Sequence, residues 1–327
     1  MRSLITGGAG FAGSHLAEHL LELGQEVVIV AAEQEDLANT AHFRDRVRIE
    51  RADLRDAPRL EAIVRDTAPR HVYHLAALSS PADSVPNPGL TYEVNLMGTL
   101  NLLLACRNLS AECRFLFVSS SEVYGTVGED DLPLREETPL RPANPYAGSK
   151  AAGELLAYQF FRSYGLTVVR VRPFNHTGPR QSSEFVCSDF ARQIAEIDLG
   201  LRPPTLTVGN LKVGRDFSDV RDIVRGYRLL LEEGEPGEVY QLGSGRAVTI
   251  EEILQILAGM SSQSIQVVVD PSRVRPAEAP ALWGETSKAE RAVGWKRQYD
   301  LSSTLRDLKQ YWEEMLRPTA ASKTSVS

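Results

Sequence analysis

The sequence predicts a doubly wound α/β fold, in which helices cover both faces of a parallel sheet, together with a smaller mixed α/β domain. Strand-like apolar runs alternate with helix-like amphipathic stretches as far as about residue 172. These runs are nearly continuously apolar, which is typical of strands buried on both faces. A glycine-rich turn joins the first run to the first helix. In such folds the ligands bind at the carboxyl ends of the strands.

The sheet and its covering helices follow from the hydrophobic pattern. The predicted strands are Arg2–Thr6, Glu26–Val30, Arg46–Arg51, His71–Leu75, Arg114–Ser119 and Thr167–Arg172. The predicted helices between them are Ala12–Leu23, Pro58–Thr67, Leu90–Asn108 and Ser149–Tyr164. Alternation of this kind indicates strand–helix–strand units with right-handed crossovers.

Beyond residue 172 the pattern loosens into short strands mixed with helices. The predicted strands here are Thr205–Val208, Val239–Leu242 and Ile265–Val269, and the helices are Phe185–Leu199, Val220–Glu232, Thr249–Met260 and Leu301–Met315. We expect residues 1–172 and about 217–242 to form the Rossmann-type NAD(P)-binding domain, and about 173–216 and 243–315 to bind a specific ligand. Residues 318–327 are polar and aperiodic, and we expect them to be disordered.

Composition narrows the class of protein. The 327 residues are 43% hydrophobic and 24% charged, with a net charge of −7, which argues against broad binding to nucleic acid or to an anionic membrane. No apolar run approaches the roughly 20 residues of a membrane span, and residues 1–2 lead directly into the first predicted strand without the basic region and cleavage site that we would expect of a signal peptide. We therefore expect a cytoplasmic protein. Three cysteines without a C-x-x-C motif predict neither a disulfide framework nor a metal site.

The first turn carries a variant of the dinucleotide fingerprint. Gly7, Gly10 and Gly13 form G-x-x-G-x-x-G between the first strand and the first helix. Small residues let the backbone approach a pyrophosphate, and the following helix N-terminus, which includes Phe11 and Ala12, attracts its negative charge. We expect NAD(H) or NADP(H) to bind here.

The preference between the two cofactors stays open. An acidic residue at the tip of the second strand binds the ribose of NAD, whereas an arginine favours the phosphate of NADP. Ala31 and Ala32 supply neither group, and Glu33 is compatible with either reading. Asp53, at the end of the third strand, is placed to meet the adenine.

Two further motifs bring together groups able to move a proton. The segment S-S-S-E-V-Y-G at residues 119–125 follows a buried strand, and Y-x-x-x-K places Lys150 one helical turn after Tyr146. We expect the ammonium of Lys150 to lower the pKa of the Tyr146 phenol, so that it can exchange a proton with a sugar oxygen. Glu122 is a second candidate acid or base.

With these motifs, T-G-G-A-G-F-A-G (6–13), H-L-A-A (74–77) and V-N-L-x-G-T (94–99), the chain resembles the extended short-chain dehydrogenase/reductase family of nucleotide-sugar enzymes over residues 1–315. The resemblance implies that Ser120 is the catalytic hydroxyl, Tyr146 the acid/base and Lys150 its partner, and that Tyr124 supports the pocket. The cofactor-binding residues that it implies are Gly7, Gly10, Phe11, Ala12, Gly13, Asp53, Leu54, Leu75, Ala76, Ala77, Asn95, Tyr146, Lys150 and Phe174. It also implies a homodimer formed through helices 90–108 and 149–164.

The second half resembles the GDP-mannose branch of this family. The motifs that carry the resemblance are R-P-F-N-H-T-G-P (172–179), F-V (185–186), V-G-N (208–210), R-D-F-S-D-V-R-D (215–222) and R-P-A-E (275–278). The substrate-binding residues implied are Ser79, Asn175, His176, Val186, Asn210, Arg215, Arg275 and Glu278. Arginine forks such as those of Arg215 and Arg275 suit the diphosphate of a GDP-linked sugar.

Two activities within this branch fit the sequence. The favoured one is reduction of the C4 keto group of GDP-4-keto-6-deoxy-D-mannose to GDP-D-rhamnose, because the motifs at 215–222 and 275–280 resemble the reductase more closely. The alternative is 4,6-dehydration of GDP-mannose, in which Glu122 would be the base. Epimerisation of another nucleotide sugar and a non-catalytic cofactor-sensing role are minor alternatives, the latter opposed by the intact Ser120, Tyr146 and Lys150.

Overall fold

A parallel sheet of seven strands forms the centre of the protein. The computed structural model describes residues 1–109, 113–273 and 281–324, the stretch 318–324 by its backbone alone. The strands follow the order β3-β2-β1-β4-β5-β6-β11. Their bounds are β1 (Arg2–Thr6), β2 (Glu26–Ala31), β3 (Arg48–Arg51), β4 (His71–His74), β5 (Arg114–Val118), β6 (Thr167–Pro173) and β11 (Val239–Leu242). The strand order reverses between β1 and β4, which is where doubly wound sheets bind their ligands.

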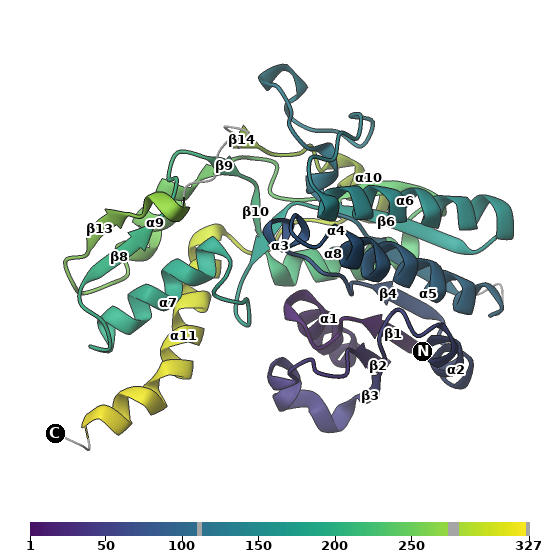
Figure 1. Cartoon of the computed structure of the whole chain (residues 1–327), viewed down its shortest axis with the longest axis horizontal. Coiled ribbons are helices and arrows are strands. Elements are labelled where there is room, and N and C mark those ends of the chain that lie inside the picture. The colour runs from purple at the N-terminus through teal and green to yellow at the C-terminus, as the bar shows by residue number, and fades with distance from the viewer. Residues whose placement is uncertain (110–112, 274–280, 325–327) are drawn as a thin grey trace.

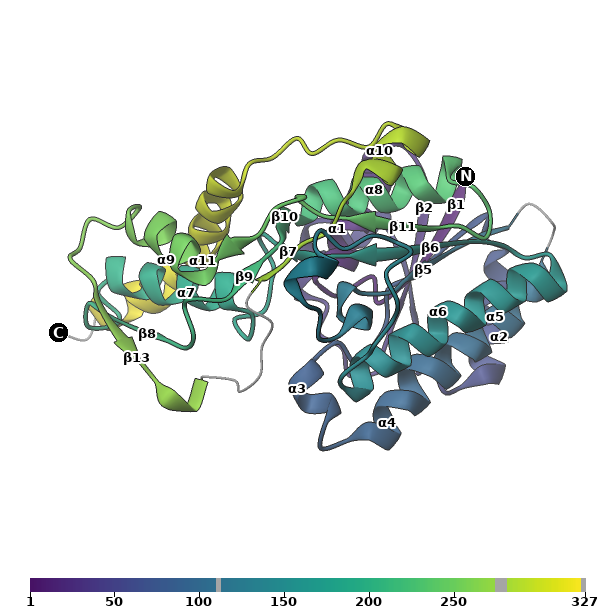
Figure 2. The same cartoon turned by 90° about the horizontal axis from the view of Figure 1, so that it is seen from above.

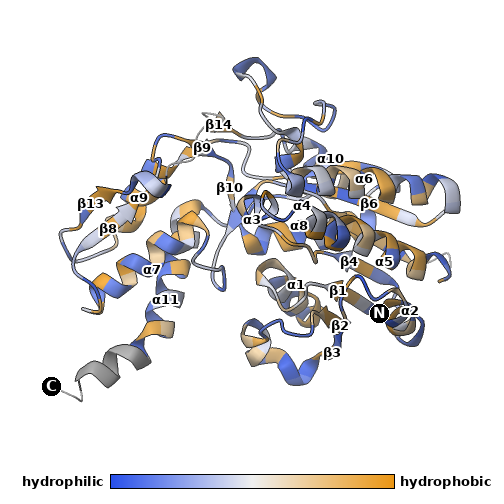
Figure 3. Cartoon of the chain, in the orientation of Figure 1, coloured by the Kyte–Doolittle hydropathy of each residue, from blue (hydrophilic) through white to orange (hydrophobic). Residues whose placement is uncertain are grey.

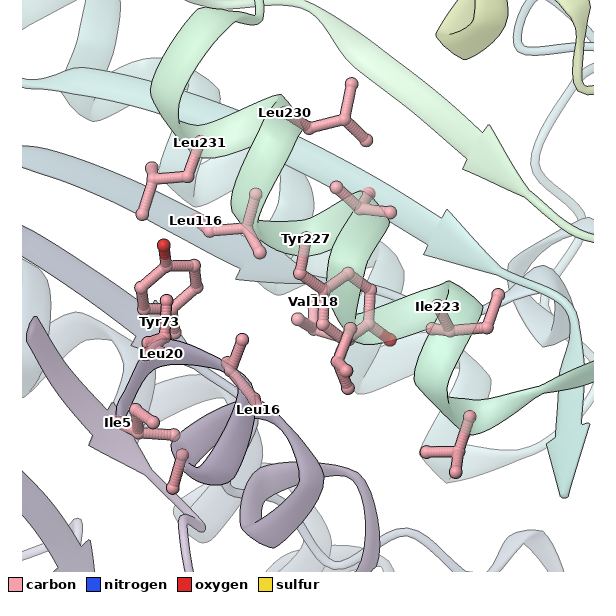
Figure 4. Close-up of a cluster of buried hydrophobic side chains, with 14 of the residues drawn as sticks. Ile5, Leu16, Leu20, Tyr73, Leu116, Val118, Ile223, Tyr227, Leu230 and Leu231 are labelled. Carbon is pink, nitrogen blue, oxygen red and sulfur yellow. The ribbon is translucent and has the colours of Figure 1, made fainter. Parts of the chain in front are cut away.

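Helices cover both faces of this sheet, as the sequence predicted (Figures 1 and 2). The helices on one face are α1 (Phe11–Glu22), α8 (Val220–Glu233) and α10 (Ser287–Val293), and those on the other are α2 (Ala57–Thr67), α5 (Gly98–Arg107) and α6 (Pro145–Tyr164). Figure 4 shows the first face, where Leu16 of α1 and Tyr227 of α8 pack over buried sheet residues such as Leu116. The apolar strands and helix stripes that drive this packing are the orange parts of Figure 3.

A second lobe lies beyond the carboxyl ends of these strands (Figure 1). Its helices are α7 (Val186–Asp198), α9 (Ile250–Ala258) and α11 (Leu301–Thr324), and its short strands include β8 (Thr205–Val208) and β13 (Gln266–Val269). The three helices and β8 share a separate apolar core, built around Phe190, Ile253 and Leu305, whereas β13 is exposed. Other short strands, β7 (Asn175–Thr177), β9 (Gly214–Arg215), β10 (Phe217–Asp219), β12 (Val248–Thr249) and β14 (Ala281–Leu282), form two further small sheets.

The structure differs from the predicted elements in three places. Predicted helix 90–108 is broken into α4 (Pro88–Tyr92), the π-helical turn η2 (Glu93–Met97) and α5. Helix α6 begins at Pro145, because the Asn144 side chain caps it by accepting the Ala147 N–H at 2.8 Å, so Tyr146 lies inside the helix. Helix α11 continues to Thr324, although the sequence predicted disorder from Pro318; the high helix propensity of alanine at 320 and 321 favours the extension.

The remaining short elements occupy the connections. They are α3 (Pro81–Ser84), η1 (Ala38–Arg46), η3 (Ser121–Tyr124), η4 (Glu129–Asp131) and η5 (Pro271–Arg273). Within the part of the chain described, none of the helices combines the length and the apolarity that crossing a membrane requires.

Candidate active site

The glycine loop between β1 and α1 has the close backbone packing that a dinucleotide requires. Gly7 has a φ of +70°, and a Cβ added there would lie 2.9 Å from the backbone nitrogen of Ala76. A Cβ at Gly13 would lie 2.0 Å from the carbonyl oxygen of Gly7. Any larger side chain would therefore push the loop out of place, whereas glycine leaves the backbone accessible beside the first turn of α1. The loop fits the pyrophosphate of NAD or NADP.

The tip of β2 contains a carboxylate that sequence reasoning missed. Glu33 is exposed, but Glu35 turns back, and its Oε2 accepts the Ala32 N–H at 3.1 Å. A Cβ at Gly10 would lie 3.8 Å from Glu35 Oε1, so this carboxylate borders the glycine loop, and burial raises its pKa. Arg51 donates to the carbonyls of Ala32 and Glu35 at 2.5 and 2.9 Å. A negatively charged group, Glu35, and a positively charged group, Arg51, thus both lie near the expected position of the ribose.

The turn after β3 holds Asp53 and Leu54, the residues that the sequence predicted at the adenine. The carboxylate of Asp53 is hydrogen-bonded by Arg55, from Nε at 3.0 Å and from the backbone N–H at 2.8 Å, and these bonds lower its pKa. Leu54 is buried against α5, since a Cβ at Gly98 would lie 2.6 Å from its own Cβ.

Asn95 fastens the loop after β4 to helix α6. Its Oδ1 accepts the Leu78 N–H at 2.8 Å, and its Nδ2 donates to Ser149 Oγ at 2.9 Å. The half-buried residues Leu75, Ala76 and Ala77 and the exposed Ser79 lie on this loop. Asn95 is buried in the π-helical turn, and such turns often occur at functional sites. Its visible role is to hold the loop in place.

Ser120, Glu122 and Tyr146 meet at the carboxyl end of β5. Ser120 caps the turn η3, where its Oγ accepts the Glu122 N–H at 3.2 Å. Burial raises the pKa of Tyr146 to about 12; the Ser120 hydroxyl opposes this rise, and the nearby charge of Glu122 adds to it. The phenol is therefore protonated at neutral pH.

Lys150 is tied to the sheet beneath the phenol. Its Nζ donates to the carbonyl of Val118 at 2.8 Å, and burial lowers its pKa to about 8. The pKa of Tyr146 is raised by burial, not lowered as the sequence predicted, and the Lys150 ammonium donates to the β5 carbonyl of Val118. The arrangement favours Tyr146 as a proton donor.

Tyr124 and Phe174 lie beneath the site rather than in it. The Tyr124 side chain is fully buried, and its hydroxyl accepts from Arg172 Nη1 at 2.8 Å. Phe174 is 2% exposed and belongs to the same apolar cluster as Tyr124 and Ala151. The side chain of Phe174 packs in this cluster, since Gly243 and Gly284 allow close approach to its ring, so the predicted contact of Phe174 with the cofactor would be made by its backbone.

Strand β7 brings two predicted substrate residues to the glycine loop. The His176 ring stacks on Phe11, with ring centroids 5.8 Å apart and an interplanar angle of 12°. His176 Nδ1 also lies 3.0 Å from the carbonyl oxygen of Phe174, and burial lowers the pKa of the imidazole. Asn175 is half-buried beside it. His176 thus links the two halves of the chain.

Three of the other predicted substrate residues, Val186, Asn210 and Arg215, lie on the second lobe. Val186 begins α7, and the Asn210 side chain accepts the Lys212 N–H at 3.0 Å in a turn. Arg215 is half-buried on β9, where Nη1 bonds the carbonyl of Gly214 at 2.8 Å. Arg275 and Glu278 lie outside the described residues. Among the residues described, no cluster of three His, Cys, Asp or Glu could hold a metal ion.

Comparison with known proteins agrees with this geometry. The family model described as GDP-mannose 4,6 dehydratase matches residues 4–308. GDP-6-deoxy-D-mannose reductase of Pseudomonas aeruginosa is 36% identical, over 97% of this chain and 98% of that protein. GDP-mannose 4,6-dehydratase of Yersinia enterocolitica is 32% identical, over 90% of this chain and 89% of that protein.

Solved structures give the same result. RMD from Pseudomonas aeruginosa, complexed with NADPH, is 35% identical and superposes with a TM-score of 0.84 over 96% of this chain and 99% of that one. UDP-glucose 4-epimerase of Thermus thermophilus, in complex with NAD, is 34% identical with a TM-score of 0.83, over 95% of this chain and 99% of that one. The fold and the Ser–Tyr–Lys site define an extended short-chain dehydrogenase/reductase. Within that class, the chain belongs to the GDP-mannose 4,6 dehydratase family.

Proposed function

We propose that this protein reduces the C4 keto group of GDP-4-keto-6-deoxy-D-mannose to give GDP-D-rhamnose, with NADH or NADPH as reductant. The observation that carries the proposal is the Tyr146 phenol, which is buried within hydrogen-bonding reach of the Ser120 hydroxyl and one helical turn from Lys150, and which is protonated at neutral pH. Similarity to the reductase of Pseudomonas aeruginosa over nearly the whole chain supports the same activity.

Each residue of the site has a separate role in the proposed reduction. The nicotinamide cofactor, when bound, supplies the hydride that reaches C4 of the sugar. Tyr146 donates its proton to O4 as the C–O double bond becomes an alcohol, and Ser120 donates a hydrogen bond to the same oxygen. Lys150 supplies a positive charge beneath them and, as in the family, a contact to the nicotinamide ribose. General acid catalysis of this kind contributes roughly 10²–10⁴ in rate.

Substitution of Tyr146 tests the proposal. Tyr146→Phe removes the acid and keeps the buried ring, so we expect kcat for the keto sugar to fall about 100-fold or more with cofactor affinity unchanged. Tyr164→Phe at the end of the same helix is the matched control, since Tyr164 is 51% exposed. Near-normal turnover of Tyr146→Phe would remove this residue from the mechanism.

Dehydration of GDP-mannose is the second candidate, and Glu122 is the observation that favours it. Its charge acts on Tyr146, so its carboxylate lies near the phenol, where a base for the C5 proton would be required. Incubation with GDP-mannose and no added reductant separates the two activities. A dehydratase forms the 4-keto sugar without net use of cofactor, and Glu122→Gln abolishes this reaction. A reductase leaves GDP-mannose unchanged and consumes NADH or NADPH when the keto sugar is supplied.

We assign the lobe of the seven-stranded sheet to the cofactor and the second lobe to the GDP-linked sugar. Arg215 on β9 is our candidate for the diphosphate, because a guanidinium binds two phosphate oxygens at once. Substitution by lysine keeps the positive charge but cannot form the paired hydrogen bonds of a guanidinium. We expect Arg215→Lys to raise KM for the nucleotide sugar while leaving cofactor binding unchanged, as measured by initial rates and by fluorescence titration.

We also propose a homodimer formed through α4, α5 and α6. Large apolar side chains are exposed on these neighbouring helices, among them Leu90, Leu104, Leu155 and Tyr158. Leu155 is 60% exposed, the largest exposed fraction among these four, and a patch of several such side chains is what a second copy would cover. Light scattering should give twice the monomer mass for the wild type and the monomer mass for Leu155→Glu. A monomeric wild type would refute the dimer.

A further inference from the structure

The face of α6 that carries the catalytic pair continues to a third buried polar residue. Tyr146, Lys150 and Glu154 are spaced four residues apart, so they follow one another along the same side of the helix. All three are buried, and Glu154 is 1% exposed. A carboxylate so deeply buried requires a partner of opposite charge.

Arg172, at the end of β6, supplies that partner and extends the contact to the turn after β5. Its Nε donates to Glu154 Oε2 at 2.9 Å, and its Nη2 donates to Oε1 at 2.6 Å. Its Nη1 donates to the Tyr124 hydroxyl at 2.8 Å and to the Glu136 carbonyl at 2.9 Å. The guanidinium also lies over the Tyr124 ring, 5.1 Å from its centroid.

Tyr124 is the last residue of η3, the turn that Ser120 caps and that contains Glu122. The side-chain amide of Gln241 on β11 also hydrogen-bonds its hydroxyl. The chain of contacts from Glu154 through Arg172 to Tyr124 therefore joins the two segments that carry the catalytic groups, α6 and η3. It does so from behind the site, where every member is buried.

Stability alone does not explain a buried ion pair at this place. Well-packed apolar side chains of similar volume often stabilise a protein as well as such a pair does, because removing two charges from water is costly. The two hydrogen bonds between an arginine and a carboxylate have fixed directions, whereas apolar packing has none, so the ion pair can fix the relative position of two segments. An error of about 1 Å in the position of a catalytic group can cost about 100-fold in rate.

We propose that Glu154, Arg172 and Tyr124 are positioning residues, which hold Ser120 and Glu122 in register with Tyr146 and Lys150. The inference rests on the proposed catalytic roles of these four residues. None of the three positioning residues needs to touch substrate, and their contribution is the relative placement of η3 and α6.

A neutral double variant separates positioning from stability. Glu154→Gln with Arg172→Met removes both charges together, and it leaves a side-chain oxygen for Arg170, whose Nη1 lies 3.5 Å from Glu154 Oε1. We expect a melting temperature close to that of the wild type, unchanged KM for the cofactor, and a kcat lower by about 10- to 100-fold. Tyr124→Phe keeps the ring and removes the hydroxyl, and we expect the same pattern with a smaller loss.

Arg170→Met is the matched control. Arg170 also approaches Glu154, but its Nη2 donates to the Gly237 carbonyl at 2.6 Å and its guanidinium lies over the Tyr158 ring. We expect its kcat to stay within about twofold of the wild type, because it is not part of the link to η3. A double variant and a Tyr124→Phe variant that both fold and keep wild-type kcat would overturn the proposal.

Hydrogen exchange gives a readout that does not need turnover. We expect faster exchange in residues 119–125 of Tyr124→Phe and of the double variant than in the wild type or the control. A wild type that fails to reduce the keto sugar would refute the proposed function, and exchange would still decide the positioning role. Unchanged exchange in 119–125 of Tyr124→Phe would overturn that role, whatever the activity.

Discussion

Replacing Gly13 by alanine tests the steric basis of the cofactor loop. The added Cβ would lie 2.0 Å from the carbonyl oxygen of Gly7 and 2.7 Å from Cα of Gly8, and both of these are backbone atoms. Ordinary van der Waals contact begins at 3.4 Å, so the first distance is 1.4 Å too short. The loop and the first turn of α1 must therefore move apart.

The expected loss of free energy, in cofactor binding and in folding, follows from this overlap. Overpacking of this kind costs roughly 1–3 kcal/mol, which corresponds to about 5- to 150-fold in an equilibrium constant. We expect the cost to fall mainly on cofactor binding, because the displaced backbone is the part that meets the pyrophosphate. The fluorescence of NADH and NADPH on titration gives the dissociation constants, and thermal unfolding shows how much of the cost falls on the fold itself.

Gly89→Ala is the control for this experiment. Gly89 lies in α4, and a Cβ there meets nothing within 4 Å. We expect this variant to bind both cofactors as the wild type does. Wild-type dissociation constants and an unchanged melting temperature for Gly13→Ala would refute the steric argument, and with it the placement of the pyrophosphate.

Three further predictions follow from buried polar groups. Because burial lowers the pKa of Lys150 to about 8, we expect kcat/KM to fall as the pH rises above about 8, and a flat alkaline profile would contradict the need for its ammonium. Burial also lowers the pKa of His71 to about 4 and of His74 to about 3, from 6.5 in the unfolded chain. Since the unfolded chain takes up these protons first, the free energy of unfolding should fall from about pH 6.5 towards pH 4, and equal values by urea titration at about pH 7 and pH 5 would argue against the effect. Asn95→Ala leaves the Leu78 N–H without its acceptor, so we expect weaker cofactor binding at a modest loss of stability, and titration of NADH together with thermal unfolding checks both.

Local patterns in the sequence were sufficient for most strands of the sheet and for choosing the candidate catalytic side chains. Apolar runs predicted β1, β5 and β6 to within one residue at each end, because strands buried on both faces need apolar side chains throughout. Residues Tyr146 and Lys150 were recognised because a spacing of four places side chains on one face of a helix. The glycine loop was recognised because close backbone approach excludes larger residues.

Contacts between distant segments were beyond the reach of local patterns. Strand β11 was predicted as a short strand within residues 217–242 of the Rossmann-type domain, but its parallel pairing with β6 at the edge of the main sheet was not predicted, because it joins segments about 70 residues apart. The approach of Glu35 to the glycine loop likewise depends on the path of the chain after β2.

The sequence by itself determined which groups the site contains, since residue type and spacing record the chemistry of a glycine loop, a phenol and an ammonium. Only the tertiary structure decided the pKa values of these groups and their positions relative to one another. Burial raises the pKa of Tyr146, whereas the sequence predicted a lowered pKa. The Arg172 fork joins residues 124 and 154, which are distant in sequence. Desolvation and directional hydrogen bonds depend on everything that surrounds a group, and that environment exists after the chain has folded.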